Sequence, residues 1–323
     1  MRGIDEALHR RMRDVKDRIS GDFLARPDVT GIGVGLKLID GRQTGILSIF
    51  FCVKRKGKFA PKNLLPSKME GFPTDVIEAD FGQDWVKAAP RAKGSAAVDP
   101  ARYIRLEGGI SIAPSRLSNG SGTLGVIVTD IATQMPMILS NAHVLALSDG
   151  RAQVGDAICQ QSRADNPTGE CNACATLSRW ALRNSVIGGH NVGVDAAVAL
   201  VRTDLRPVSP RAIFGIGGGI EAAPMDAAIG QILSKRGRTT NMTSGVVGSV
   251  DMDVQKPTLI MHNQIRIDTP PGRNPFAQAG DSGSICVTRE NSRNYAVALL
   301  WGADRVAVAS PLDAVLQQMA VSL

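Results

Sequence analysis

Short strand-like runs dominate the chain after about residue 105 and limit its fold more than any other feature. Valine, isoleucine, leucine and alanine gather in brief segments that glycine, asparagine, aspartate and proline separate. The segments are 110–113, 123–129, 137–139, 157–160, 195–201, 230–234, 246–250, 259–267, 284–287 and 296–300. Many short strands with few helical patterns indicate an antiparallel barrel or sandwich. We therefore expect a mainly β protein.

The beginning of the chain shows a different pattern. Apolar residues recur there at helical spacing and predict an amphipathic helix over 3–25. The stripe consists of Ile4, Leu8, Met12, Val15 and Ile19. Strand-like runs follow at 29–38, 45–54 and 74–81. These elements predict a small N-terminal α+β domain over 1–86, then a linker rich in Ala, Pro, Lys and Gly over 87–104, and a main domain over 105–323.

The motif Gly280-Asp281-Ser282-Gly283-Ser284 carries the strongest chemical signal. Small residues on both sides of one hydroxyl leave room for a substrate and leave backbone N–H groups free to donate. A serine hydroxyl is a poor nucleophile at neutral pH and needs an adjacent base. We therefore expect Ser282 to be a nucleophile that a histidine elsewhere in the chain activates.

The chain has four histidines, at positions 9, 143, 190 and 262. His143 follows the small residues Ser140-Asn141-Ala142 and is the preferred base, because imidazole titrates near neutral pH. His190 is the other candidate for the base. The second alternative is that His143 has only a structural role, as a histidine at the end of a strand. Asp195 lies in an apolar run where an unpaired carboxylate is costly, so it needs a partner, for which His143 is preferred. Asp204 is the less favoured acid.

In chain order, His143, Asp195 and Ser282 follow the arrangement of the chymotrypsin-like serine proteases. The chain resembles this clan over about residues 105–320. Within the clan, the segments 233–240 and 280–284 resemble bacterial trypsin-like proteins related to the plant Narrow Leaf protease. The resemblance implies a chymotrypsin-like double antiparallel β-barrel, with His143 and Asp195 in the first barrel and Ser282 in the second.

The resemblance also implies the roles of further residues. Asp195 should orient His143, and the backbone N–H groups of Gly280 and Ser282 should form the oxyanion hole. The segment 298–302 resembles the strand that pairs with substrate, and Phe276 stands where trypsin-like enzymes carry an acid. A shallow pocket for small or medium apolar side chains is therefore expected. Its predicted residues are Phe276, Leu300, Trp301 and Gly302.

Two further expectations come from the clan. In its secreted members, the aspartate equivalent to Asp281 pairs with an N-terminal amine that zymogen cleavage releases. This chain has no obvious activation site before Glu107, so either another cation holds Asp281, which we favour, or cleavage occurs near Gly108. A C-terminal helix is also implied, with Ser310 as its N-cap and Pro311 in its first turn.

Five cysteines, an odd number, fit a cytoplasmic protein. Cys52, Cys159 and Cys286 lie in apolar surroundings and are interpreted as buried thiols. Cys171 and Cys174 form a Cys-x-x-Cys that predicts an ordinary loop with two thiols. The alternatives are a local disulfide or a metal site completed by Cys159 and His190. We expect neither a metal nor a cofactor.

The net charge of +7 includes a basic run of Lys54, Arg55, Lys56, Lys58, Lys62 and Lys68. A solvated hairpin tip is expected there. Nucleic-acid binding is less favoured, because only Phe59 is interleaved as a stacking platform. The sequence contains no run of 18 apolar residues, so no membrane span is predicted. The first 18 residues lack the apolar core of a secretion signal. These features predict a cytoplasmic location.

These residues predict an intracellular serine endopeptidase that cleaves protein or peptide substrates through an acyl-enzyme. The alternative is a catalytically silent, protease-like protein-binding module, against which the intact His, Asp and Ser set argues. The apolar stripe of the first helix must be covered by the strands of its own domain, by the protease domain or by another subunit. Because relatives of the plant protease assemble into oligomers, we also predict a homo-oligomer.

Overall fold

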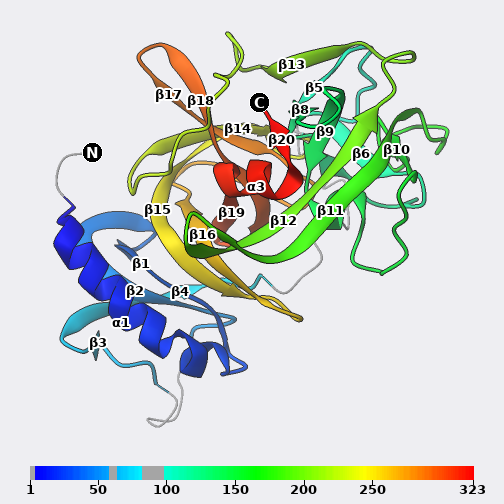
Figure 1. Cartoon of the computed structure of the whole chain (residues 1–323). Helices are drawn as coiled ribbons and strands as arrows, with labels where there is room; N and C mark the ends of the chain where they lie inside the picture. Colours follow the sequence, from blue (N-terminus) through cyan, green and yellow to red (C-terminus); the bar gives the residue numbers. More distant parts are fainter. Residues whose placement is uncertain (1–3, 58–63, 82–97) are drawn as a thin grey trace.

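The computed structural model describes residues 4–57, 64–81 and 98–323. Strands are their main secondary structure, mostly in antiparallel pairs, and are arranged as an N-terminal unit and two barrels (Figure 1). The N-terminal unit comprises α1 (Glu6–Leu24), β1 (Val29–Ile39), β2 (Arg42–Val53), β3 (Lys68–Met69) and β4 (Phe72–Glu78). The predicted helix and three strands are all present, and β3 is a short addition.

Helix α1 covers its apolar stripe within the same chain. Asp5 caps its first turn by accepting from the backbone N–H groups of Ala7 and Leu8. Met12 and Val15 are buried in one cluster with Ile32 of β1 and other residues of the N-terminal sheet. The stripe is therefore intramolecular packing, and it no longer argues for a second subunit.

The first barrel is built from a long central hairpin and shorter strands around it. Its elements are β6 (Ser111–Pro114), β7 (Gly122–Thr123), β8 (Val126–Asp130), β9 (Pro136–Ser140), β10 (Ala157–Cys159), β11 (Ala173–Ile187), β12 (His190–Val201) and β20 (Val321–Ser322). The sheet order is β20-β8-β9-β12-β11-β10-β6-β7. Because β7 continues into β8 after two residues, the segment 122–130 pairs with both β6 and β9 and closes the barrel.

The second barrel is closed by direct pairing of six strands. They are β14 (Ile232–Gly237), β15 (Asn241–Gln255), β16 (Ile260–Asp268), β17 (Ile285–Glu290), β18 (Arg293–Ala303) and β19 (Val306–Pro311). Their order is β14-β17-β18-β19-β16-β15, and β15 pairs back to β14. A separate parallel pair, β5 (Leu106–Gly108) and β13 (Val208–Ile213), lies outside both barrels. The expected double barrel is confirmed.

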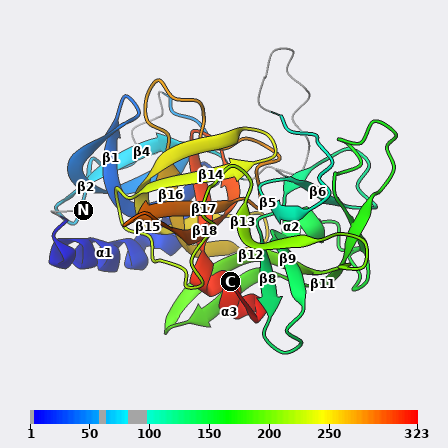
Figure 2. The ribbon, with the colours of Figure 1, turned by 90° about the horizontal axis from the view of Figure 1, so that it is seen from above.

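The N-terminal unit extends the sheet of the second barrel. β1 pairs with β15, so one ten-stranded sheet runs through both units. Glycines permit this close approach, because a Cβ at Gly33 would lie 2.6 Å from the Phe50 ring and 3.1 Å from the Met252 backbone. The second barrel therefore lies between the N-terminal unit and the first barrel (Figure 2). The linker predicted at 87–104 lies outside the described residues up to residue 97.

Buried charges also join the N-terminal unit to the second barrel. Lys16 of α1 is 2% exposed and lies 3.0 Å from the carboxylate of Asp253 on β15. Ser20 donates to the same carboxylate oxygen at 3.0 Å. On the other face of Asp253, His262 lies 3.1 Å away. The predicted α+β unit is thus packed against the second barrel rather than held apart from it.

The C-terminal helix α3 (Leu312–Met319) is present, but its predicted cap is wrong. Pro311 is the N-cap and makes no side-chain cap hydrogen bond. Ser310 belongs to β19 instead, where its buried hydroxyl donates to Gln264 at 2.9 Å. A strand that runs directly into the helix leaves no turn in which the serine could cap it.

The cysteine interpretation also changes. Cys159 and Cys171 form a disulfide that closes a loop between β10 and β11, so neither is the free thiol that we expected. Cys52, Cys174 and Cys286 are buried free thiols. Burial raises the pKa of each of these three to about 12. In the described part of the chain, no group of three or more His, Cys, Asp or Glu side chains could hold a metal ion.

The described residues contain no helix with the length and apolar character that crossing a bilayer requires. In the basic run, Lys58 and Lys62 lie outside the described residues, as does Phe59. The described part of the run follows β2, where Lys54 and Lys56 are exposed.

Candidate active site

The first barrel brings His143 and Asp195 together. His143 lies in the short helix α2 (Ala142–Leu145), which follows directly on β9, and Asp195 lies on β12, which pairs with β9. The Nδ1 atom of His143 lies 2.7 Å from Oδ2 of Asp195, and the backbone N–H of His143 donates to Oδ1 at 3.2 Å. Asn141 also donates to the Asp195 carbonyl at 2.8 Å. The predicted histidine and aspartate are therefore partners.

Asp195 is fully buried, and a lysine contacts it in addition to His143. Lys256 Nζ lies 3.1 Å from the Oδ2 atom that also faces His143. Burial alone would raise the pKa of Asp195, but the neighbouring charges of His143 and Lys256 outweigh it, so that the pKa lies below its usual value. The carboxylate is therefore ionised, and it can accept a hydrogen bond from the Nδ1–H of a neutral imidazole.

Ser282 comes from the second barrel, in the loop before β17. It is 3% exposed, and its hydroxyl donates to the Trp301 carbonyl at 3.4 Å. The Nε2 atom of His143 is buried and has no hydrogen-bond partner among the described residues. The structure therefore joins two of the three predicted residues. Catalytic hydrogen bonds in ligand-free enzymes are often long, so this geometry does not dismiss Ser282.

The loop that carries Ser282 packs directly against the segment before His143. Gly283 has a φ of +97°, and a Cβ there would overlap the Thr123 carbonyl and the Ser140 hydroxyl. The backbone N–H of Thr123 donates to the Ser282 carbonyl at 2.8 Å. Only glycine meets both the backbone and the packing requirement at position 283. This contact holds the two barrels together beside the candidate site.

The oxyanion-hole prediction concerns the N–H groups of Gly280 and Ser282. Gly280 has a φ of +96°, which glycine adopts without strain. Within the described chain, neither N–H donates to a protein acceptor. Both donors are therefore available to a ligand, as an oxyanion hole requires.

Asp281 is held by Lys235 of β14. Both side chains are completely buried, and Lys235 Nζ lies 3.2 Å from Oδ2 of Asp281. Burial lowers the pKa of Lys235, and the Asp281 charge opposes that shift. The backbone N–H groups of Thr239 and Thr240 donate to the other oxygen at 2.8 and 3.0 Å. Of the two alternatives for Asp281, the structure supports another cation.

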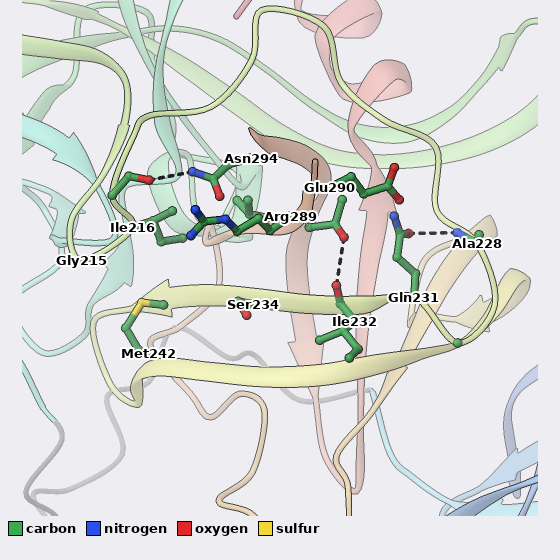
Figure 3. Close-up of a pocket in the computed structure, with 14 residues that line it drawn as sticks. Gly215, Ile216, Ala228, Gln231, Ile232, Ser234, Met242, Arg289, Glu290 and Asn294 are labelled. Carbon is green, nitrogen blue, oxygen red and sulfur yellow. Dashed lines mark hydrogen bonds between the residues drawn. The ribbon is translucent and has the colours of Figure 1, made fainter. Parts of the chain in front are cut away.

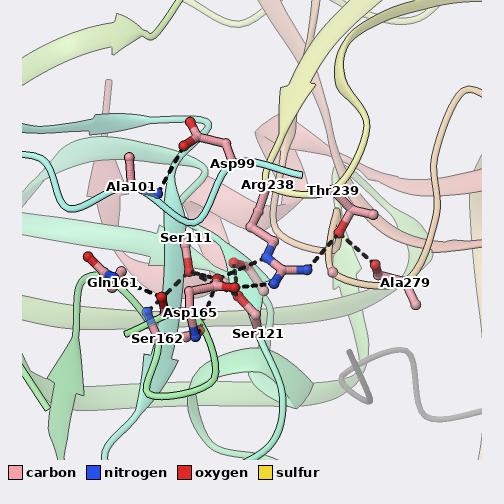
Figure 4. A network of polar contacts seen from close by, with 12 residues as sticks. Asp99, Ala101, Ser111, Ser121, Gln161, Ser162, Asp165, Arg238, Thr239 and Ala279 are labelled. Carbon is pink, nitrogen blue, oxygen red and sulfur yellow. Dashed lines mark hydrogen bonds and ion pairs between the residues drawn. The ribbon is translucent and has the colours of Figure 1, made fainter. Parts of the chain in front are cut away.

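A second ion pair connects the β14–β15 turn, whose backbone binds Asp281, to the first barrel (Figure 4). Arg238, the residue before Thr239, pairs with Asp165 through Nη2 and through Nε at 2.9 Å. Asp165 lies inside the loop that the disulfide closes, and it also accepts from Ser111 Oγ at 2.6 Å and Ser162 Oγ at 3.1 Å. The Arg238–Asp165 pair is therefore a direct bridge between the barrels.

The predicted substrate-binding residues lie beside Ser282, but they are covered. Leu300, Trp301 and Gly302 all lie on β18, and the Trp301 side chain is fully buried. Lys256 Nζ lies 4.4 Å from the centre of the Trp301 rings, and Phe81 of the N-terminal unit contacts them edge-on at 6.3 Å. Phe276 is 1% exposed and belongs to the core of the second barrel. The preference for apolar side chains stays a prediction.

A sizeable cavity lies away from these residues. It measures about 690 Å³ and lies between the β14–β15 and β17–β18 hairpins and the loop around Gly215 (Figure 3). Ile232 and Met242 contribute apolar surface, and Arg289 and Glu290 contribute charge. None of the predicted catalytic residues lines it. This cavity is therefore separate from the candidate active site.

Sequence reasoning missed three charged residues of the site. Lys235 lies within a segment that carried the family resemblance, and its place on a buried strand was the available signal. Asp165 and Lys256 carry no local pattern that marks them. They act on loops and side chains that are distant in the chain, so only the fold places them.

No family model and no curated protein matches the chain. Solved structures do match, several of them over 68% of this chain. The chain has the topology described above: two antiparallel barrels, with His143 and Asp195 in the first and Ser282 in the second, six-stranded one. Its fold is chymotrypsin-like.

Three of the matching structures are serine proteases. One is described as a glutamic acid specific serine protease, with 16% identity, a TM-score of 0.48, and coverage of 68% of this chain and 100% of that one. Thermobifida fusca protease A has 16% identity, a TM-score of 0.46, and coverage of 68% and 98%. An alpha-lytic protease homologue, N4, has 19% identity, a TM-score of 0.43, and coverage of 68% and 98%. At these scores the likeness carries no argument about activity.

Proposed function

We propose that this chain is a serine endopeptidase in which His143, Asp195 and Ser282 form one catalytic unit. The single observation that carries the proposal is the His143–Asp195 pair at 2.7 Å, which leaves His143 Nε2 without a protein partner. An imidazole fixed in this way can accept a proton through Nε2. The free N–H groups of the Ser282 loop support the same conclusion.

The proposed reaction follows from these atoms. His143 Nε2 takes the hydroxyl proton of Ser282 as Oγ attacks the peptide carbonyl carbon, and the carbonyl oxygen receives hydrogen bonds from the Gly280 and Ser282 N–H groups. The C–N bond then breaks, and His143 gives its proton to the leaving amine. Water hydrolyses the acyl-enzyme by the same steps, which restores the serine.

A fluorophosphonate probe tests this proposal without a known substrate, because it reacts with an activated serine. Stoichiometric labelling at Ser282 of the full chain supports it. One observation favours the alternative of a catalytically silent binding module, since the Ser282 hydroxyl donates to Trp301 rather than to His143. An unlabelled, folded protein would establish that alternative.

Lys235 should make activation cleavage unnecessary. In Lys235→Met, Asp281 would lose its buried cation at 3.2 Å, and the Ser282 loop would lose its support. We expect labelling to slow roughly a hundred- to thousand-fold, as for loss of an oxyanion-hole donor, and unfolding to cost about 3–5 kcal/mol less. Labelling rates and chemical unfolding measure the two effects.

The charge-preserving control is Lys235→Arg, which should retain most of the labelling rate. Intact mass of the labelled wild-type protein provides a second check. A labelled species that has been cut near Gly108, or full activity of Lys235→Met, would show that Lys235 does not take the place of a new N-terminus.

We further propose that the N-terminal unit restricts access to the site and that the pocket prefers small or apolar side chains. Phe81 lies against Trp301, which belongs to the strand that the family resemblance predicts to pair with substrate. In Phe81→Ala we expect labelling to accelerate on the order of tenfold, because loss of this contact favours open states. Peptide libraries would measure the side-chain preference.

The matched control is Phe51→Ala. Phe51 is also fully buried in the N-terminal unit, but its ring contacts Phe23 at 4.7 Å instead. If both truncations accelerate labelling equally, the effect is general loosening. If Phe81→Ala leaves the rate unchanged, the proposed restriction is wrong.

Location and assembly remain predictions. The Cys159–Cys171 disulfide is typical of oxidising compartments and stands against the cytoplasmic setting that the composition suggested. The homo-oligomer prediction has lost its structural basis, because α1 is covered by its own sheet. Light scattering of the full chain tests the subunit number directly.

A further inference from the structure

Lys256 belongs to a strand connection of the second barrel, and its side chain contacts Asp195 in the first barrel. It lies at the turn between β15 and β16, where its backbone N–H donates to the Leu259 carbonyl at 2.9 Å. Its ammonium group reaches the first barrel and lies 3.1 Å from Asp195 Oδ2. The side chain is 15% exposed, so this ion pair is largely shielded from water.

One carboxylate oxygen therefore faces two nitrogen atoms, one from a lysine and one from a histidine. Oδ2 of Asp195 faces Lys256 Nζ at 3.1 Å and His143 Nδ1 at 2.7 Å, while Oδ1 accepts only from the His143 backbone at 3.2 Å. An aspartate stabilises a protonated imidazole through its negative charge. A lysine on the same oxygen offsets that charge, so the imidazolium gains less from it.

No other charged side chain among the described residues faces Asp195 in this way. On β11, Leu182 is its pairing partner, and the neighbouring Arg183 is exposed. On β15 and β16, Asp253 and His262 pair with each other. His143 from α2 and Lys256 from the β15–β16 turn are therefore the charges that act on this carboxylate.

Lys256 also touches the substrate side of the site. Its ammonium lies 4.4 Å from the centre of the Trp301 rings, within cation–π range. The Trp301 carbonyl accepts the Ser282 hydroxyl at 3.4 Å. Lys256 thus connects the His143–Asp195 pair with the strand that carries the carbonyl beside the candidate nucleophile.

We propose that Lys256 is a positioning residue that shares the Asp195 carboxylate with His143, and that its charge keeps His143 unprotonated to lower pH. This inference rests on the proposed function, because it assigns His143 the role of base. As a consequence, the reaction rate should persist to a lower pH than it would with the His143–Asp195 pair alone. Trp301 holds the ammonium in place for this role.

The test compares pH profiles of the fluorophosphonate labelling rate in the full-length protein. In Lys256→Met, the midpoint of the acid limb should move up by about one pH unit, because removal of a like charge beside the imidazolium favours its protonated form. Lys256→Gln removes the charge but keeps a hydrogen-bond donor, and it should shift the midpoint in the same direction. Lys256→Arg keeps the charge and should leave it unchanged. Lys54→Met, at an exposed lysine, is the surface control.

A second measurement does not depend on activity. In Ser282→Ala protein with labelled histidines, the His143 signal is followed by NMR against pH, and its midpoint should rise in Lys256→Met. The four histidines keep the spectrum simple. Wild-type protein that never labels would refute the proposed function while leaving this titration informative. Equal His143 midpoints with and without Lys256, in folded protein, would overturn the inference.

Discussion

Ser282→Ala is expected to abolish fluorophosphonate labelling and peptide hydrolysis. The change removes the atom that attacks the peptide carbonyl in the proposed reaction, and loss of such a serine costs roughly a million-fold in turnover in a comparable enzyme. The fold should be retained, because the hydroxyl makes only one long hydrogen bond, at 3.4 Å to Trp301. We expect the free energy of unfolding to change by about 0.5 kcal/mol or less.

The matched control is Ser244→Ala. Ser244 is exposed on β15, and its hydroxyl contacts Ser234 at 2.8 Å, outside the candidate site. This variant should label at the wild-type rate. If Ser282→Ala protein still takes up the probe with the same stoichiometry, the nucleophile lies elsewhere and the proposed catalytic unit is wrong.

His143→Ala and Asp195→Asn should each lower the labelling rate and turnover by several orders of magnitude, about ten-thousand-fold for the aspartate in a comparable enzyme. In Asp195→Asn the amide no longer supplies the charge that stabilises the imidazolium. It also leaves Lys256 Nζ, now 3.1 Å from the carboxylate, beside a neutral group. Steady-state kinetics and chemical unfolding, measured on the same preparations, separate lost catalysis from lost stability.

These effects should be far from additive. Once Ser282 is alanine, removal of His143 should cost almost nothing further, because the residues act as one unit. His190→Ala is the control, since His190 is exposed at the start of β12 and has no contact with Asp195 among the described residues. An inactive His190→Ala protein beside an active His143→Ala protein would reverse the histidine assignment.

The local sequence was a good guide to element type where one pattern was strong. The helical stripe of α1 and the runs of β1, β2 and β4 were predicted to within a few residues. β11 (Ala173–Ile187) was missed although it is one of the longest strands. Its polar and apolar residues do not alternate cleanly, because the strand is only partly buried, and so it shows no period that indicates a strand.

The sequence predicted the residues of the candidate site that belong to a motif. It did not predict the charged residues that support them. Gly280 and Gly283 follow from the sequence because their backbone angles and packing demand glycine, and this demand is visible as a motif. The cation beside Asp281 was left open, and Lys256 was not predicted as a second partner of Asp195. Lys235 is far from Asp281 in the chain, and Lys256 is far from Asp195, so no local spacing connects either pair.

By itself, the sequence determined many of the segments that become strands, which face of α1 is buried, and where a serine could lie among glycines. These properties depend on side chains close together in the chain. The tertiary structure decided that β1 joins the second barrel through β15, that Cys159 pairs with Cys171, and that Lys256 reaches Asp195. A strand's pattern sets which face it buries but leaves both edges free to pair. Its neighbours, and the charges that they bring, are therefore chosen only when the whole chain packs.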